Sequence, residues 1–344
     1  MCLSTGIKKL VAQRDITCYK VLKTNGNKYL TPYRNTKVEL NKELVADEPE
    51  YDYGERNSYS IGTGYIHALL CFNVDDLSCD FGDGAMAFKA IIPAGTEFFI
   101  DGNLSQICAR KMFITDEKMK ESVSRNNAPE WLSESMTSQG AYAESVNGVY
   151  VGDFCVAQED GSKKYIRPLE YTDEIDKDII GVVGFFKDGK PVVISRNDKY
   201  EAWCNIPWGS RPLINKDVDY DDTAEQMNGE ELTVNVLKHK SYTKDNYPAF
   251  DYISHFKTKG TKEGDWYIGA IGELRKLANF TALLNVSLGM LEGADLLDFW
   301  LWSSSEYDSD NAWSLLPSDG YVRISIKYNS LRVRAFAVFA VAKD

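Results

Sequence analysis

The chain has 344 residues, 44% of them hydrophobic and 26% charged, which is the composition of a globular protein of about two domains. Its formal net charge of -12 argues against nucleic acid and anionic membranes as partners, because binding to either depends on Lys and Arg. No apolar run in the sequence is long enough to span a bilayer, so membrane insertion is not expected.

The seven cysteines are odd in number and form no Cys-x-x-Cys pair, which favours reduced, structural thiols in a protein made in a cytoplasm. The first ten residues, MCLSTGIKKL, lack the apolar segment of a secretory signal. We therefore expect cytoplasmic synthesis without a standard export signal.

Residues 1–115 contain short β-rich runs separated by Gly, Asn and Asp, which predicts a small α+β domain. The Pro93-Ala94-Gly95 corner is expected to split one run into a hairpin-like pair. Residues 48–60 are acidic and rich in tyrosine, and we interpret them as a surface loop. Residues 116–147 have scattered Ser, Asn and Lys, which is typical of a helical or irregular connector.

Strand-like sequence resumes at Gly148, and we place the second domain at 148–344. Two apolar runs, at 179–186 and 190–195, are joined by the turn residues Asp188 and Gly189, which predicts a β-hairpin.

Helices are predicted after this hairpin. A helix is expected in only part of 222–240, because Gly229 lies inside the pattern, whereas Pro248 suits the first turn of another helix. The apolar spacing over 271–291 predicts two short helices that pack on a sheet built by the final strands.

The segment 299–339 combines bulky aromatics, a polar turn and an alternating strand. Trp300, Trp302 and Trp313 are large enough to anchor a core. After the turn signal Asp319-Gly320, polar and apolar residues alternate with a period of two. The alternation predicts that Tyr321, Arg323 and Ser325 face water while Val322, Ile324 and Ile326 face the core.

A series of motifs occurs in order through the second domain. They are GVYVGDF (148–154), IIGVVGFF (179–186), GKPVVIS (189–195), DWYIGAIGEL (265–274), WSSSEY (302–307), NAW (311–313), DGYV (319–322) and RVRAF (332–336). In these motifs the chain resembles the C-type-lectin-like domains of variable proteins from diversity-generating retroelements of gut bacteria and their phages. The resemblance covers roughly 148–344 and implies an α+β protein whose C-terminal domain has the C-type-lectin-like fold, also found in formylglycine-generating enzymes, preceded by a small α+β domain.

In that family a reverse transcriptase copies a template with errors at adenines, and the copy replaces the end of the target gene. The resemblance implies a variable ligand-binding surface made of Ser314, Leu316, Tyr321, Arg323, Ser325, Ile326, Leu331 and Phe336. It implies a constant scaffold made of Trp302, Asn311, Trp313, Gly320, Arg332 and Arg334. Strand periodicity favours a core position for Ile324, and for Ile326 the periodicity and the family pattern disagree, which leaves both readings open.

The implied function is non-enzymatic binding of a protein or glycan on a target cell by an adhesin or phage receptor-binding protein, on a virion tail or cell surface. The alternative is an invariant structural or assembly module. The N-terminal domain suits mounting or homo-oligomerisation.

No catalytic residue, cofactor or metal is expected. Residues 308–311 resemble a calcium loop but lack the glycine and distal glutamate of an EF-hand, which favours a polar turn. The three histidines have no partners at ligand spacing. Formylglycine-generating oxidases need a cysteine pair near the C-terminal core, and this chain has no cysteine after Cys204.

Overall fold

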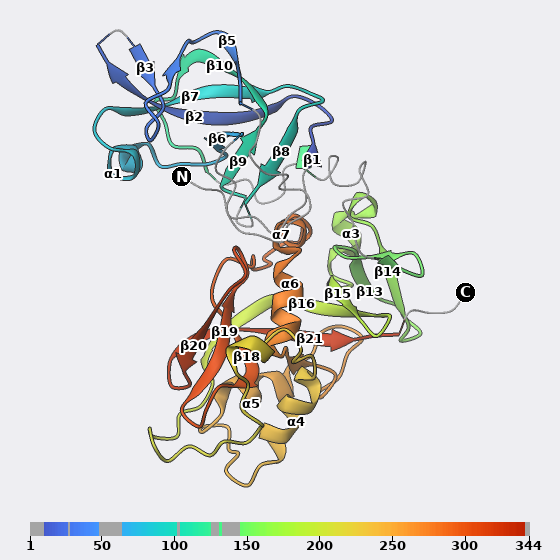
Figure 1. The fold of residues 1–344 in the computed structure, drawn as a ribbon. Coiled ribbons are helices and arrows are strands. Elements are labelled where there is room, and N and C mark those ends of the chain that lie inside the picture. Colours follow the sequence, from blue (N-terminus) through green and yellow to red (C-terminus); the bar gives the residue numbers. More distant parts are fainter. Residues whose placement is uncertain are drawn as a thin grey trace. The chain divides into compact units, whose positions relative to one another are not determined.

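The computed structural model describes residues 10–26, 28–47, 64–101, 104–124, 131–132 and 145–340. These residues form a mixed α+β protein with several β-sheets, as the sequence predicts (Figure 1). The chain divides into two compact units, Met1–Ala141 and Tyr142–Asp344. The predicted loop at 48–60 and much of the predicted connector lie outside the described residues.

The N-terminal unit is organised around a ten-stranded sheet, in which the order of the main path is β1-β8-β9-β6-β2-β7-β10-β5 and β3 and β4 extend from β2. Its strands are β1 (Leu10–Val11), β2 (Ile16–Asn25), β3 (Lys28–Leu30), β4 (Lys37–Val38), β5 (Lys42–Val45), β6 (Ile66–Leu69), β7 (Ala85–Ile92), β8 (Glu97–Ile100), β9 (Gln106–Ala109) and β10 (Lys111–Lys118). A short helix, α1 (Leu77–Phe81), follows a 3-10 turn, η1 (Val74–Asp76), and buries Leu77 and Phe81.

Two sequence-based expectations for this unit are wrong. Strands β7 and β8, on either side of Pro93, do not pair with each other, because β7 lies between β2 and β10 while β8 lies between β1 and β9. Strand β10 also continues to Lys118, and Val123 forms an isolated bridge with Phe72. The first residues of the predicted connector therefore belong to the N-terminal unit.

The C-terminal unit is built on a nine-stranded sheet with the order β14-β13-β15-β16-β21-β18-β19-β20, and β17 pairs with β21. Its strands are β13 (Phe154–Ala157), β14 (Lys163–Ile166), β15 (Ile179–Lys187), β16 (Lys190–Ala202), β17 (Tyr267–Ile268), β18 (Leu301–Glu306), β19 (Asn311–Leu316), β20 (Tyr321–Ile326) and β21 (Ser330–Val338). A separate two-stranded sheet of β11 (Ser145–Val146) and β12 (Val149–Tyr150) precedes it.

The hairpin of β15 and β16 forms at the predicted turn. Asp188 and Gly189 have φ angles of 51° and 72°, and Lys187 pairs with Lys190, which is the backbone of a tight two-residue turn. Gly181 in β15 has no room for a side chain, because a Cβ there would lie 2.1 Å from the carbonyl oxygen of Ile194. This glycine lets the two strands approach closely at the centre of the sheet.

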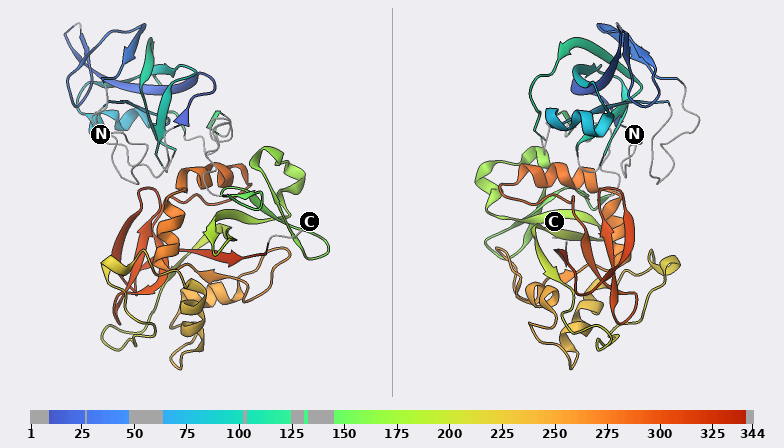
Figure 2. Two further views of the ribbon diagram at one scale, coloured as in Figure 1. Left: turned by 45° about the vertical axis from the view of Figure 1, so that its right-hand side comes forward. Right: turned by 90° about the vertical axis from the view of Figure 1, so that its left-hand side faces the viewer.

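Helices cover parts of this sheet, and Figure 2 shows two of them, the orange α6 and α7, close to strands of the sheet. The helical elements are η2 (Pro168–Glu170), α3 (Asp173–Asp176), η3 (Tyr220–Asp222), α4 (Gly229–Lys238), α5 (Pro248–His255), α6 (Ile271–Ala278) and α7 (Thr281–Met290). As predicted, α5 begins with a proline and 271–291 forms two helices, of which α6 contacts β18 and β19. Gly229 is the first residue of α4 and therefore does not interrupt the helix. A Cβ at this position would lie 2.5 Å from the backbone nitrogen of Ala270, so the close packing requires a glycine.

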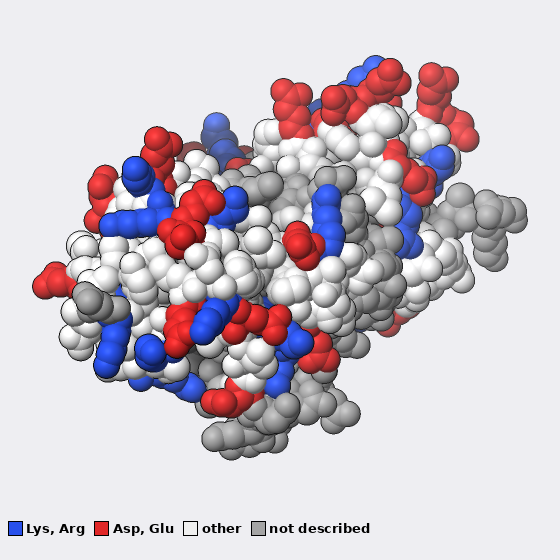
Figure 3. Space-filling view, turned by 90° about the horizontal axis from the view of Figure 1, so that it is seen from above, with Lys and Arg blue, Asp and Glu red and all other residues white. Residues whose placement is uncertain are grey.

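Charged side chains are mixed in sign on the described surface seen in Figure 3, where Lys and Arg lie among Asp and Glu. Among the described residues, every helix is too short or too polar to cross a membrane.

Candidate binding surface

Strands β18, β19 and β20 form the outer end of the C-terminal sheet, and β20 is its edge. The register places Ser314 opposite Arg323 on β20 and opposite Trp302 on β18. Because side chains alternate along a strand, Trp300 and Tyr321 lie on this same face. One face at the edge of the sheet therefore carries two aromatic side chains and a cation.

We call Trp300, Tyr321 and Arg323 the Trp300 cluster. The guanidinium carbon of Arg323 lies 3.6 Å from the centre of the Trp300 ring, which is a close cation–π contact. The ring of Tyr321 meets Trp300 edge to face at 5.9 Å, and Tyr321 is 61% exposed. The cluster therefore presents to solvent an arginine stacked on one aromatic ring, with a second ring packed against the first.

Two buried serine hydroxyls position the guanidinium of Arg323. The Nε of Arg323 donates to Ser325 Oγ at 3.2 Å, and Ser325 Oγ lies 2.8 Å from Ser314 Oγ. Both serines are buried. The stacking and the hydrogen bond fix the plane of the guanidinium, while its two terminal nitrogens have no hydrogen-bond partner within the described part of the chain. Such a pre-oriented donor loses little conformational entropy on binding.

A second group, the Arg332 cluster, consists of Tyr200, Phe299 and Arg332. The Arg332 guanidinium lies 5.1 Å from the Phe299 ring centre and 5.9 Å from that of Tyr200, and it donates to Asp198 at 2.9 Å. Phe299 and Tyr200 are 54% and 63% exposed. Since Phe299 precedes Trp300 directly, the two clusters adjoin along the chain.

Beneath the clusters, Arg334 is fully buried and ties three segments together. Its guanidinium donates to the carbonyl oxygens of Ser195 and Asp295 and to the carboxylate of Asp198 at 2.8, 3.0 and 3.1 Å. Burial raises the pKa of Asp198 above its ordinary value, although the charge of Arg334 opposes this shift. Asp198 thus links buried Arg334 to half-buried Arg332.

A buried ion pair stiffens the polar turn between β18 and β19. Lys327 donates to the Glu306 carboxylate and to the carbonyl oxygens of Asp308 and Ser309 at 2.9 and 2.8 Å, and its ammonium lies 4.6 Å from the ring centre of Trp203. Burial raises the pKa of Glu306 and lowers that of Lys327, and the attraction between them opposes both shifts.

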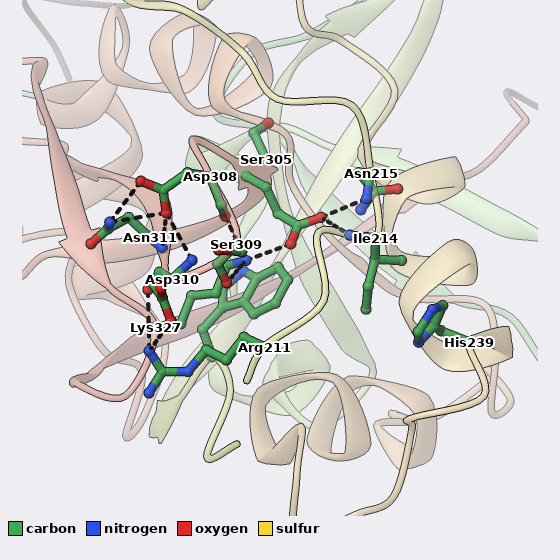
Figure 4. A network of polar contacts seen from close by, with 12 residues as sticks. Arg211, Ile214, Asn215, His239, Ser305, Asp308, Ser309, Asp310, Asn311 and Lys327 are labelled. Carbon is green, nitrogen blue, oxygen red and sulfur yellow. Dashed lines mark hydrogen bonds and ion pairs between the residues drawn. The ribbon is translucent and has the colours of Figure 1, made fainter. Parts of the chain in front are cut away.

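Figure 4 shows the surroundings of this pair. The second carboxylate oxygen of Glu306 accepts from the backbone nitrogens of Ile214 and Asn215. Arg211 donates to Asp310 at 3.1 Å. The turn is therefore fastened to the 211–215 segment by buried charge-assisted hydrogen bonds.

Residues 308–311 resemble a calcium loop in sequence, but their side chains form hydrogen bonds within the turn itself. The Asp308 carboxylate accepts from the backbone nitrogens of Asp310 and Asn311 and from the Asn311 side-chain amide. No cluster of three or more His, Cys, Asp or Glu side chains suited to a metal occurs among the described residues.

The structure separates the residues that the resemblance assigns to a variable surface. Tyr321, Arg323 and Ile326 are exposed, Leu316 and Leu331 are partly exposed, and Ser314 and Ser325 are buried under the Trp300 cluster. The expectation that Ser325 faces water is wrong, because its hydroxyl lies between Arg323 and Ser314.

Phe336 does not belong to any surface. It is fully buried, contacts the rings of Phe185 and Tyr267 at 6.1 and 6.0 Å, and lies so close to Gly269 that a Cβ there would be 2.5 Å from the Phe336 ring. Its assignment to the ligand-binding surface is wrong, because it sits on β21 at the centre of the sheet.

Ile324 also differs from its expected place. It is 43% exposed, and Ile326 is 40% exposed, although both share a face with buried Val322. Ala278 of α6 lies near Gly320, in the turn before β20, whereas Ile324 and Ile326 lie further along this edge strand. The period of two identifies correctly that these residues share one face of β20, but it does not show how much of that face other elements bury.

The scaffold residues all lie within or next to the core. Trp302, Trp313 and Arg334 are fully buried, Asn311 and Arg332 are partly buried, and Gly320 has a φ of 69° in the turn before β20. Trp313 donates its ring N–H to the carbonyl oxygen of Val218 at 2.8 Å.

Sequence reasoning missed Trp300, Phe299 and Tyr200 as surface residues. Trp300 was expected to anchor the core, but it is only partly buried. The signal was the FWLW pattern at 299–302, in which Trp300 and Trp302 share one face. Only Trp302 lies within β18, and it is fully buried.

No protein-family model matches the chain, and no curated protein matches it. Among solved structures, it is similar to a fimbrial protein from Bacteroides ovatus, with a TM-score of 0.47 and 10% sequence identity over 95% of this chain. The chain spans 65% of the length of that fimbrial protein. This level of similarity does not establish a shared fold.

Proposed function

We propose that the chain is a non-enzymatic binding protein whose C-terminal unit is a C-type-lectin-like display domain. Its partner is a protein or glycan on the surface of a target cell, and the chain acts as an adhesin or phage receptor-binding protein on a cell surface or virion tail. The N-terminal unit mounts this domain or assembles it into a homo-oligomer.

One observation carries the proposal, namely the stacked arginine of the Trp300 cluster. Tyrosine, tryptophan and arginine are the side chains most enriched in binding hot spots, and the two aromatic ones offer large contact areas at low entropic cost. Arg323 is held by Trp300 and Ser325, so its terminal nitrogens are ready to donate to a carbonyl, carboxylate or hydroxyl group.

The division between rigid and exposed residues supports a surface that varies. The side chains of Tyr321, Arg323, Ile324 and Ile326 point outward from an edge strand, while Arg334 and the Lys327–Glu306 pair lie in buried networks. Replacing the first group changes contacts with solvent, whereas replacing the second removes buried bonds.

A library test distinguishes residues that form a variable binding surface from residues that are needed for packing. Tyr321, Arg323, Ile324 and Ile326 are randomised together, and the fraction of folded members is counted by protease resistance on a display platform. We expect most members to fold and some to acquire binding to an arbitrary protein such as lysozyme. A control library with Phe336 randomised is expected to unfold except with large apolar residues. Loss of folding in the first library would contradict the proposal.

The variation itself has a genomic test. If the gene belongs to a retroelement, its 3′ end has a near-identical repeat that differs only opposite adenines, beside a reverse-transcriptase gene. The differing codons should include those of the exposed residues Tyr321 and Arg323 and exclude that of Trp313. Absence of such a repeat would reject retroelement variation and leave a fixed binding surface.

A second function, that of an invariant assembly module, is favoured by the edge of β20. Among the described strands β20 pairs only with β19, and it exposes Ile324 and Ile326. Open edges of this kind pair with further strands. Multi-angle light scattering of the wild type against Ile324→Lys distinguishes the two functions, because an assembly through this edge should dissociate in the variant.

A further inference from the structure

The N-terminal unit contains a cavity of about 380 Å³, within the range of small-molecule sites. Its wall comes from β2, from the turn at 31–36, from the end of β5 and from β6. The apolar part of the lining consists of Val21, Leu44, Val45, Ile66, Leu69 and Phe81. These side chains provide space for the hydrocarbon body of a ligand.

Lys20 on β2 also lines this cavity. The residue is only 8% exposed, and its ammonium donates to the carbonyl oxygen of His67. Among the described residues the Lys20 ammonium forms this one hydrogen bond, and no carboxylate of the described residues forms an ion pair with Lys20. An ammonium has three donors, so two of them remain unused at the cavity wall.

A buried ammonium without a counter-charge is unfavourable, because burial removes its hydration and nothing replaces it. Burial accordingly lowers the pKa of Lys20 to about 8, and the thiols of Cys18 and Cys108 oppose this only in part. The other ionisable side chains of the lining are Tyr33, Arg34, Asp47, Tyr65 and His67. Of these, Arg34 adds a positive charge and Asp47 a negative charge, both on exposed residues, so Lys20 is the buried charge of the lining.

We propose that the N-terminal cavity binds a small molecule with an apolar body and a single carboxylate, which the ammonium of Lys20 receives. The carboxylate supplies the missing counter-charge and accepts the two unused N–H groups. The apolar lining takes the remainder of the ligand. This site is separate from the surface of the C-terminal unit and does not depend on its function.

The first test uses octanoate and the full-length protein in isothermal titration calorimetry, with 1-octanol as the uncharged match. We expect octanoate to bind and octanol to bind at least tenfold more weakly. Lys20→Met keeps the size and apolar stem of the side chain and should weaken octanoate at least tenfold, whereas Lys23→Met, three residues along the same strand and outside the cavity lining, should not. Equal binding of octanoate by wild type and Lys20→Met would overturn the proposal, as would no binding at millimolar octanoate.

A second measurement needs no variant and therefore does not depend on how Lys20→Met folds. The pKa of Lys20 is followed by NMR of its 13Cε atom with and without octanoate. A bound carboxylate stabilises the ammonium, so saturation should raise this pKa from about 8 towards its ordinary value. Octanol should leave it unchanged. Octanoate binding that leaves the pKa of Lys20 unchanged would place the ligand elsewhere and reject the site.

Discussion

Among the described residues each unit buries one lysine, Lys327 or Lys20, and the surroundings of the two differ. Lys327 in the C-terminal unit has a carboxylate partner, two carbonyl acceptors and an aromatic ring. Lys20 in the N-terminal unit has one carbonyl acceptor and an adjoining cavity. A buried charge whose bonds are complete stabilises a rigid turn, whereas one whose bonds are incomplete has capacity left for a ligand.

The largest expected effect comes from breaking the complete pair. Lys327→Met leaves Glu306 buried without its cation and should lower the free energy of unfolding of the C-terminal unit by about 3–5 kcal/mol, measured by urea denaturation with tryptophan fluorescence. Lys199→Met is the control, because the Lys199–Glu201 pair is on the surface and should contribute no more than about 1 kcal/mol. Similar losses in both variants would show that the buried pair has no special role.

The same substitution at Lys20 should act in the opposite direction. Below pH 8 the folded protein keeps an unpaired buried charge that the unfolded chain hydrates, so Lys20→Met should stabilise the N-terminal unit. A shift of the pKa from 10.5 to about 8 corresponds to up to about 3 kcal/mol.

This gain should depend on pH in a defined window. Between about pH 8 and 10.5 the unfolded chain binds more protons at Lys20 than the folded protein, so wild-type stability rises with pH and the advantage of Lys20→Met disappears. Urea unfolding of both proteins at pH 7, 9 and 10.5, followed by NMR signals of the N-terminal unit, measures the difference. Destabilisation by Lys20→Met at all three values would show that Lys20 is well satisfied.

The smallest effects are expected on the exposed strand. Tyr321→Ser, Ile324→Ser and Ile326→Ser should each change the free energy of unfolding by about 0.5 kcal/mol or less, since these side chains are exposed. Arg323→Ala should cost at most about 1 kcal/mol, the value of an exposed cation–π contact. Thermal denaturation measures all four, and a loss above about 2 kcal/mol at any of them would identify a packing residue.

Features that depend on residues close together in the chain could be predicted from the sequence. The Asp188-Gly189 turn, the helix start at Pro248 and the two helices after Ile271 depend on residues close in the chain, whose backbone preferences act whatever the rest of the fold does. The alternation on β20 likewise identified which residues share a face.

The burial of residues whose neighbours come from distant segments could not be predicted from the sequence. Phe336 is buried because β17 and β15 bring Tyr267 and Phe185 against it, whereas Ile324 is exposed on the edge strand β20. The Lys20 cavity needs β2, β5 and β6 together, and a single lysine in an apolar strand gives no signal of its own. Periodicity describes one element, whereas burial depends on the neighbours that the fold supplies.

The position of β21 also constrains how the protein is made. It follows the other strands of its sheet in chain order, yet it lies at the centre between β16 and β18, with Ile194 paired to Phe336. A contact over so many residues forms slowly, because a long loop must close first. On the ribosome the N-terminal unit has all its strands available early, while the C-terminal sheet stays divided until β21 has emerged. During that interval β16 and β18 have open edges, which is when chaperones are most needed.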